Sequence, residues 1–247
     1  MIPIKTADEI KSMREGGKIL AHVLNTIKTS IKEGISSIEL DDIAKKEVTK
    51  LGAQPAFLGY SGFPAAICIS INDAVVHGVP NNYIIKNGDI VSLDFGVKYR
   101  GMYTDAARTH LVGADESAKT IFINSTKISL EKGIQAVKEG ARIGDISSAV
   151  QEFLESAGYG VVRDLIGHGV GKMLHEDPNI PNFGISGSGP LLKDGMVLAI
   201  EPMSTMGDYS VKTAEDGWSV LTSDGSLSAH FEDTVLVTKD GSEILTR

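Results

Sequence analysis

The chain has 247 residues, of which 42% are hydrophobic, and this is enough for a full core and excludes an intrinsically disordered chain. Its 24 basic and 32 acidic residues give a formal charge of −8, which argues against a membrane-surface protein or a nucleic-acid-binding protein. The single cysteine, Cys68, excludes an intrachain disulfide and a cysteine-based zinc site.

Two helices are predicted at the start of the chain. Each opens with a Ser/Thr and a Glu at capping-box spacing, continues with apolar residues at helical spacing, and closes at a glycine. The first predicted helix runs from Thr6 to Gly34 and the second from Ser36 to Gly52.

The next segments alternate between strand and helix patterns. Between residue 66 and about 112, apolar residues alternate with small ones, which predicts strands. Helical spacing returns over about 115–139 and again over 145–157. Strands and glycine-rich loops are predicted from about residue 160 onward.

The sequence contains an internal echo. Lys32-Glu33-Gly34 recurs as Lys138-Glu139-Gly140, and the run from Asn87 to Asp94 resembles the run from Asp194 to Glu201 at an offset of 107. Chance matching of common residues is one explanation. The other is an internal duplication whose halves pack about a pseudo-twofold axis and bring Asp94 and Glu201 together. No Pro/Ser-rich linker separates the halves, so we expect one catalytic domain over residues 1–247.

Two aspartates lie in a predicted hairpin. A turn centred between Tyr99 and Arg100 sets Asp94 opposite Asp105, with Cβ atoms about 5 Å apart. Two carboxylates this close repel each other unless one is protonated or a cation lies between them. The alternative is an exposed hairpin whose two acids are solvated.

Three further residues could complete a cation site. His168 lies between two glycines, Glu201 follows an apolar run, and Glu232 precedes a predicted strand. A buried carboxylate is costly unless it is paired or bound to a metal. Taken singly, each residue could instead be a buried acid bonded to the backbone or a core histidine.

Asp94, Asp105, His168, Glu201 and Glu232, in this order and context, resemble the five metal ligands of the methionine aminopeptidase family, which belongs to the pita-bread metallopeptidases. The resemblance covers nearly the whole chain. It also includes the segments Asn72–Pro80, Gly167–Gly171 and Ile200–Pro202, and His175 seven residues after His168. It implies an α+β fold of two pseudo-symmetric halves, with a central curved antiparallel sheet flanked by two helix pairs.

Four carboxylates and one histidine suit two divalent cations, because the ligand charge balances the charge of the metals. The resemblance implies that Asp94 chelates one ion, that Asp105 and Glu232 bridge both, and that His168 and Glu201 hold the other. It also makes Glu201 the general base. Cobalt, manganese, iron and zinc all accept such ligands.

The resemblance further implies two catalytic histidines and a methionine pocket. His77 and His175 resemble the residues that hydrogen-bond the scissile amide and the tetrahedral intermediate, whereas His22, His110 and His230 match no functional position. By position, the pocket residues are Phe57, Tyr60, Phe63, Cys68, Leu174 and Trp218. Ordinary core packing is the alternative for Phe57 and Leu174.

The implied activity is removal of the N-terminal methionine from nascent or newly made proteins whose second residue is small. An Xaa-Pro aminopeptidase of the same fold and a catalytically dead binding protein are the alternatives. We expect a monomer that binds Met peptides. Ribosome association should be weak at most, because Ser204–Gly225 contains only one lysine. The chain shows neither an apolar run of about 18 residues nor a signal-peptide pattern at its start, so we expect a cytoplasmic enzyme.

Overall fold

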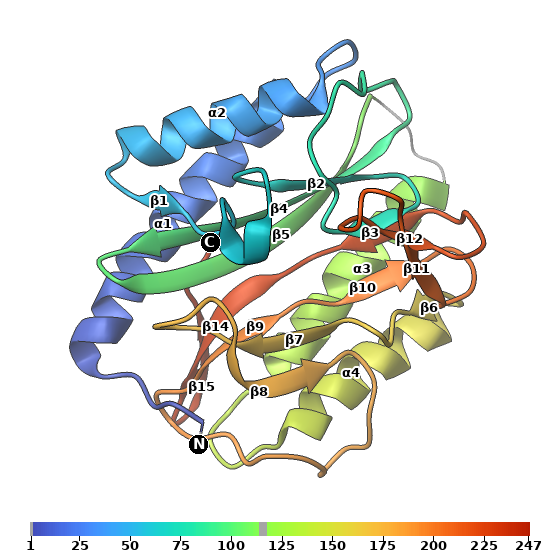
Figure 1. Ribbon diagram of the computed structural model, residues 1–247. Helices are drawn as coiled ribbons and strands as arrows, with labels where there is room; N and C mark the ends of the chain where they lie inside the picture. The colour runs from blue at the N-terminus through green and yellow to red at the C-terminus, as the bar shows by residue number, and fades with distance from the viewer. Residues whose placement is uncertain (1, 114–117) are drawn as a thin grey trace.

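The computed structural model describes residues 2–113 and 118–247. Two packed helix pairs flank a central layer of strands (Figure 1). These helices are α1 (Ala7–Ser30), α2 (Ser37–Lys50), α3 (Ala118–Gln135) and α4 (Ile143–Ser156). The predicted order of helix pair, strands, helix pair and strands is therefore confirmed, except that residues 114–117, at the start of the third predicted helix, lie outside the described residues.

Both predicted capping boxes are present. The Thr6 hydroxyl accepts a hydrogen bond from the Glu9 amide, and the Glu9 carboxylate accepts one from the Thr6 amide at 2.8 Å. Ser36 and Glu39 repeat the arrangement at α2. These reciprocal bonds satisfy amides that a helix start otherwise leaves unpaired.

The end predicted for the first helix is wrong by four residues. The helix stops at Ser30 because Ile31 adopts extended backbone. Gly34 lies beyond it with a φ of 92°, and its amide donates to the carbonyl of Ile85 at 2.9 Å. The glycine therefore forms the turn toward α2 rather than ending α1.

The strands between the helix pairs form antiparallel sheets (Figure 1). The first sheet contains β1 (Gln54–Pro55), β2 (Cys68–Ile71), β4 (Ile90–Tyr99) and β5 (Met102–Leu111). The largest sheet contains, in spatial order, β15 (Gly241–Ile244), β14 (Asp233–Thr238), β9 (Val197–Ile200), β7 (Ile166–Gly169) and β8 (Glu176–Pro181). Two smaller sheets contain β13 (Ser228–His230), β10 (Met203–Thr205) and β6 (Gly160–Val161), and β11 (Val211–Thr213), β12 (Val220–Thr222) and β3 (Ala74–Val76). One turn of 3-10 helix covers Tyr60–Gly62.

The first sheet and the largest sheet meet at a backbone bridge between Ala107 and Glu232. The amide of Glu232 donates to the carbonyl of Ala107 at 3.0 Å, and the reverse bond measures 3.2 Å. Strand β5 therefore lies beside the start of β14, although more than a hundred residues separate them along the chain.

The predicted pairing of Asp94 with Asp105 is wrong. In the β4–β5 hairpin Asp94 pairs with Ala107, and Asp105 pairs with Gly96. The turn residues are Arg100 and Gly101, whose φ values of 48° and 80° are both positive, as a two-residue type I′ turn requires. The pairing is thereby displaced by two residues. A displacement of two keeps side chains on the same face, so the aspartates remain diagonal neighbours.

The sequence echo corresponds to two similar structural halves. Both ends of α4 lie 106 positions after those of α2, and β9 begins 107 positions after β4. Gly52 and Gly158, which follow the two helices, have positive φ values of 73° and 83°. Glycine accepts this left-handed backbone without steric cost, which explains its recurrence. The predicted two-halved fold is confirmed.

Each half has its own apolar cluster. Leu20 of α1 packs with Phe95 of β4 in the first half, and Phe122 of α3 packs with Leu198 of β9 in the second. All four side chains are fully buried. In the described part of the chain, no helix combines the length and the apolar character that crossing a membrane requires.

Gly17 allows α1 to contact the C-terminal segment closely. A Cβ atom at Gly17 would lie 2.0 Å from the carbonyl oxygen of Leu245. We predict that Gly17→Ala lowers the free energy of unfolding by about 1–3 kcal/mol, because the overlap outweighs the better helix propensity of alanine. Thermal unfolding measures the loss. Lys18→Ala, at an exposed position of the same helix, is the control, and an unchanged melting temperature for Gly17→Ala contradicts the prediction.

Candidate functional site

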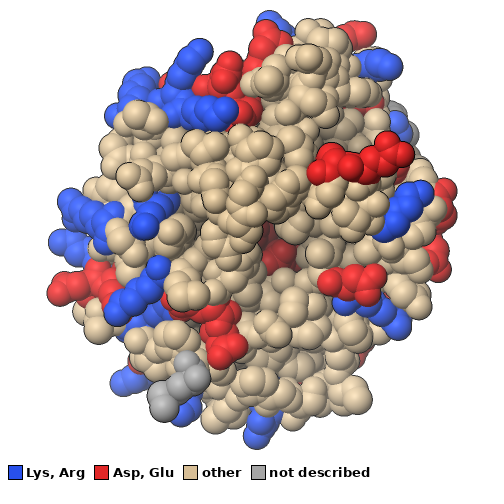
Figure 2. Space-filling view, viewed as in Figure 1, with Lys and Arg blue, Asp and Glu red and all other residues tan. Residues whose placement is uncertain are grey.

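A cavity of about 770 Å³ opens near the centre of one face, within the usual size of ligand sites. Figure 2 shows acidic atoms at the floor of this hollow. Its lining includes every residue that the sequence predicted for the site: Asp94, Asp105, His168, Glu201, Glu232, His77, His175, Phe57, Tyr60, Phe63, Cys68, Leu174 and Trp218.

The five predicted metal ligands come from five strands or strand ends. Asp94 lies within β4, Asp105 in β5 and His168 in β7. Glu201 directly follows β9 and Glu232 directly precedes β14. The two halves of the fold therefore both contribute to one cluster.

The ligand atoms converge. One oxygen or nitrogen from each of Asp105, His168 and Glu232 lies within 4.8 Å of the others. His168 Nε2 also lies 3.4 Å from Glu201 Oε1. Asp94 is close enough to raise the pKa of the Glu201 carboxyl by electrostatic repulsion.

Burial disfavours the charged forms of the four acids. It raises the pKa of Asp94 to about 7 and raises the pKa values of Asp105, Glu201 and Glu232 well above their usual range. Repulsion between the carboxylates adds to the effect for the last three. Among the described residues, no lysine or arginine lines this cavity. The acids therefore have no basic counter-charge there.

Several oxygens of the cluster also have no hydrogen-bond donor. Asp94 Oδ1, Asp105 Oδ1 and Glu232 Oε1 are buried without a partner among the described residues. A buried acceptor left unpaired costs about 1–3 kcal/mol, and more when it is charged. A divalent cation would satisfy both the lone pairs and the charge. The donor set of carboxylate oxygens and one imidazole fits first-row divalent metals.

His168 is held in the form that can ligate a cation. Its Nδ1 lies 2.9 Å from the carbonyl oxygen of Gly169, an acceptor that assigns the proton to Nδ1. Nε2 then carries the free lone pair and points to the acidic cluster. Burial, followed by the nearby His175, lowers the pKa of His168 to about 3, so the ring is neutral.

The two predicted catalytic histidines differ from the ligands because their side chains are exposed. His175 accepts or donates a 2.8 Å hydrogen bond through Nδ1 with the Tyr60 hydroxyl, and its ring meets that of His168 edge-on at 4.3 Å. His77 has a positive φ of 57°. Such backbone is uncommon for residues other than glycine, and residues that adopt it are often found at functional sites.

The predicted pocket residues form an apolar wall beside the acids. Phe63 and Trp218 meet edge-to-face at 5.3 Å. Cys68 pairs with Asp94 across β2 and β4, so its thiol lies next to the cluster. Burial raises the pKa of that thiol and keeps it neutral. Phe57 and Leu174 are buried in the same apolar cluster, which also agrees with a packing role.

The sequence analysis missed one buried residue beside the acidic cluster. His230, classed there as structural, lies with Nε2 3.8 Å from Glu201 Oε2. It is buried, and neither ring nitrogen has a hydrogen-bond partner among the described residues. A signal existed, because His230 precedes Glu232 by two positions and alternate residues of an extended chain share a face.

A buried cluster of acids and one imidazole, on a two-halved α+β fold, is typical of a metal-dependent enzyme. A model of metallopeptidase family M24 matches residues 11–239, so the chain belongs to that family.

Named relatives agree with this assignment. A methionine aminopeptidase of Clostridium perfringens is 52% identical, with 100% of this chain and 99% of that protein covered. The crystal structure of a Thermotoga maritima methionine aminopeptidase matches with a TM-score of 0.98 and 46% identity, and the match covers all of both chains. A prolidase from Pyrococcus furiosus matches with a TM-score of 0.80 and 27% identity, but only 65% of that chain is covered.

The raised carboxyl pKa values predict a pH-dependent affinity for metal. Near neutral pH the metal-free cluster holds protons that the unfolded chain would have released, and a bound cation must displace them. Affinity should therefore rise with pH between about 6 and 8, by roughly tenfold per pH unit for each proton released. Isothermal titration of metal-free protein with Mn²⁺ measures this dependence.

Two variants control that experiment. Asp94→Asn should weaken Mn²⁺ binding, whereas Asp224→Asn, at an exposed carboxyl outside the cavity lining, should not. An affinity that stays constant between the two pH values contradicts the assignment of protons to the cluster.

Proposed function

We propose that the chain acts as a type 1 methionine aminopeptidase, which removes the N-terminal methionine from newly made proteins whose second residue is small. The observation that carries the proposal is the convergence of all five predicted ligands in one cavity with two histidines and an apolar wall. Similarity to methionine aminopeptidases along the full length supports the same activity.

Asp94, Asp105, His168, Glu201 and Glu232 would hold two divalent ions, with cobalt, manganese, iron and zinc as candidates. When bound, such ions lower the pKa of a water molecule and polarise the scissile carbonyl. The unpaired oxygens of the cluster and the neutral His168 support this assignment.

Each side chain of the cavity then has its own part in the reaction. Glu201 takes a proton from the attacking water and later delivers it to the leaving amine. His77 and His175 donate hydrogen bonds to the scissile amide and to the oxygen that gains negative charge. A donor of this kind contributes roughly 3 kcal/mol to transition-state stabilisation. The Tyr60 hydroxyl, donating to Nδ1 of His175, leaves the proton on Nε2 and so orients the ring.

The apolar wall supplies the specificity. The rings of Phe63 and Trp218 and the thiol of Cys68 surround space suited to the unbranched, polarisable side chain of methionine. Tyr60 lies at the more exposed side of the same cavity. The substrate α-amine would approach the acidic cluster, which attracts a cation.

The partners follow from this activity. The proposed substrates are Met peptides and nascent chains. An enzyme that acts on nascent chains would work in the cytoplasm, and we expect it to associate at most weakly with the ribosome. We also predict that the protein is a monomer and that residues 1–247 form one catalytic domain.

A peptide panel tests the activity. Metal-loaded enzyme is expected to release methionine from Met-Gly and Met-Ala peptides but not from Met-Lys peptides, because a long second side chain would not fit beside the cluster. Chromatography of the released amino acid gives the rates. Cleavage of Xaa-Pro substrates without cleavage of Met-Ala would select the prolidase-like alternative, and no cleavage of either would select a binding protein.

Glu201→Gln tests the general base. The amide keeps the size of the side chain but cannot accept the proton, so we expect kcat to fall by about 10²–10⁴-fold. Steady-state kinetics on a Met-Ala peptide measures the loss, with metal content determined in parallel. The matched control is Glu152→Gln, on the exposed surface of α4, which should retain full activity. Turnover that persists in Glu201→Gln would assign proton transfer to another group.

A further inference from the structure

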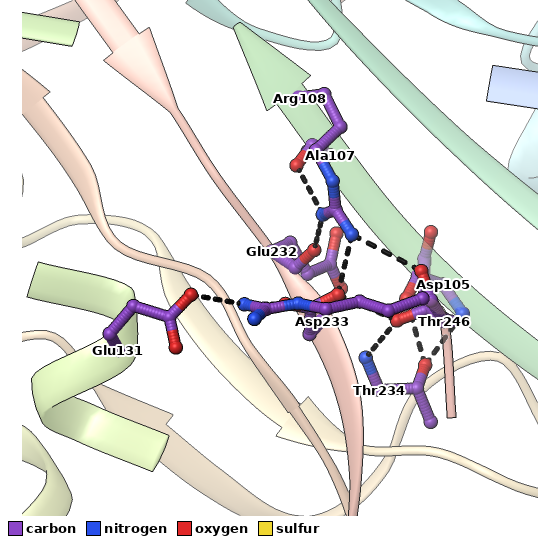
Figure 3. A network of polar contacts seen from close by, with 9 residues as sticks. Asp105, Ala107, Arg108, Glu131, Glu232, Asp233, Thr234 and Thr246 are labelled. Carbon is purple, nitrogen blue, oxygen red and sulfur yellow. Dashed lines mark hydrogen bonds and ion pairs between the residues drawn. The ribbon is translucent and has the colours of Figure 1, made fainter. Parts of the chain in front are cut away.

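A polar network lies beside Glu232 and Asp105, two acids of the cluster (Figure 3). Glu232 lines the front cavity, whereas the next residue, Asp233, lines a rear cavity of about 560 Å³ between α1 and α3. Successive residues of a strand point to opposite faces, which explains the separation. The rear network is therefore one residue away from the predicted metal ligand.

Asp233 is fully buried and fully bonded. Its Oδ1 accepts hydrogen bonds from Arg108 Nη2 at 2.6 Å and from the Thr246 hydroxyl at 2.8 Å. Its Oδ2 accepts two more from Arg247, at 2.9 and 2.6 Å. Arg247 also pairs with Glu131 of α3 at 2.6 Å. The charge of Asp233 is thus compensated without any contribution from the front cavity.

Arg108 connects this network to the backbone of the site. Arg108 Nη1 donates one hydrogen bond to the carbonyl of Glu232 and another, at 2.9 Å, to the carbonyl of the preceding residue, Ala107. These are the two residues whose backbones bridge the sheets. The guanidinium therefore holds the junction between β5 and β14 from behind.

Two threonines, Thr234 and Thr246, link the backbone of Asp105 to the same network. The Thr234 hydroxyl accepts from the Asp105 amide at 2.9 Å and donates to the Asp105 carbonyl at 2.8 Å. The Thr234 amide donates to the Thr246 hydroxyl, which in turn donates to Asp233. The backbones under Asp105 and Glu232 are thus tied to one buried ion pair.

We propose that Arg108 and Asp233 are positioning residues: they fix the backbone that carries two predicted metal ligands and thereby set the affinity of the cavity for divalent ions. The role rests on the proposed function, which assigns Asp105 and Glu232 as those ligands. Residues that orient metal ligands commonly contribute 10–100-fold to metal affinity.

Arg108→Met tests the role. Methionine fills part of the side-chain volume but donates no hydrogen bond to Glu232 or to Asp233. We expect metal-free Arg108→Met protein to bind Mn²⁺ at least about tenfold more weakly in isothermal titration. The matched control is Arg14→Met, which removes a bidentate pair with Glu243 on the exposed surface and should bind Mn²⁺ like the wild type.

The double variant Arg108→Met/Asp233→Asn separates positioning from folding. Removing Arg108 alone leaves the buried Asp233 charge with fewer partners and lowers the melting temperature of the metal-free protein. The second substitution removes that charge but also weakens the pair with Arg247, so the melting temperature should recover in part while Mn²⁺ affinity stays low. The electronic absorption spectrum of the Co²⁺-loaded double variant should also differ from that of the wild type, because it reports ligand geometry.

Two outcomes would overturn the role. Mn²⁺ affinity in Arg108→Met equal to that of the wild type, or an affinity that recovers together with the melting temperature in the double variant, means that the network only stabilises the fold. The proposed function survives both results. Failure of the wild-type chain itself to bind any of Mn²⁺, Co²⁺, Fe²⁺ and Zn²⁺ would instead overturn the metal centre, and this role with it.

Discussion

Mutual repulsion among four buried carboxylates is the constraint on which the rest of this structure depends. Asp94, Asp105, Glu201 and Glu232 share one cavity whose described lining contains no lysine or arginine. Burial alone would keep them protonated, and several of their oxygens lack any donor. Such an arrangement is unfavourable for a fold without a cation and favourable for one that binds divalent ions, so the cost of the cluster is itself part of its function.

The two-halved architecture is what makes the cluster possible. Each half supplies a helix pair and an apolar core, and each presents an acid at the corresponding place, Asp94 in one and Glu201 in the other. The halves join where Ala107 and Glu232 exchange backbone hydrogen bonds. Because the acids lie within strands or directly beside strand ends, their spacing is set before any ion arrives, which lowers the entropy cost of binding.

The two sets of predicted site residues differ in how exposed their side chains are. The acids and His168, the predicted metal ligands, are buried or nearly so, whereas the side chains of His77 and His175 are exposed. Tyr60 forms a hydrogen bond with His175, so a residue predicted only as part of the pocket wall also contacts a predicted catalytic histidine. The rings of Phe63 and Trp218 pack in an apolar cluster on the wall of the same cavity, where we propose that the methionine side chain binds.

The sequence alone determined the starts of the first two helices and the repeat, because capping and periodicity are local properties of the chain, whereas its resemblance to a family named the residues that line the cavity. It failed at the hairpin register, since the positive φ of Arg100 and Gly101 moves the turn by one residue and the pairing by two. It also did not show the contact of His230 with Glu201 or the hydrogen bond from Arg108 to the Glu232 carbonyl. Those contacts join segments more than a hundred residues or several strands apart, and only tertiary packing decides which side chains meet across such separations.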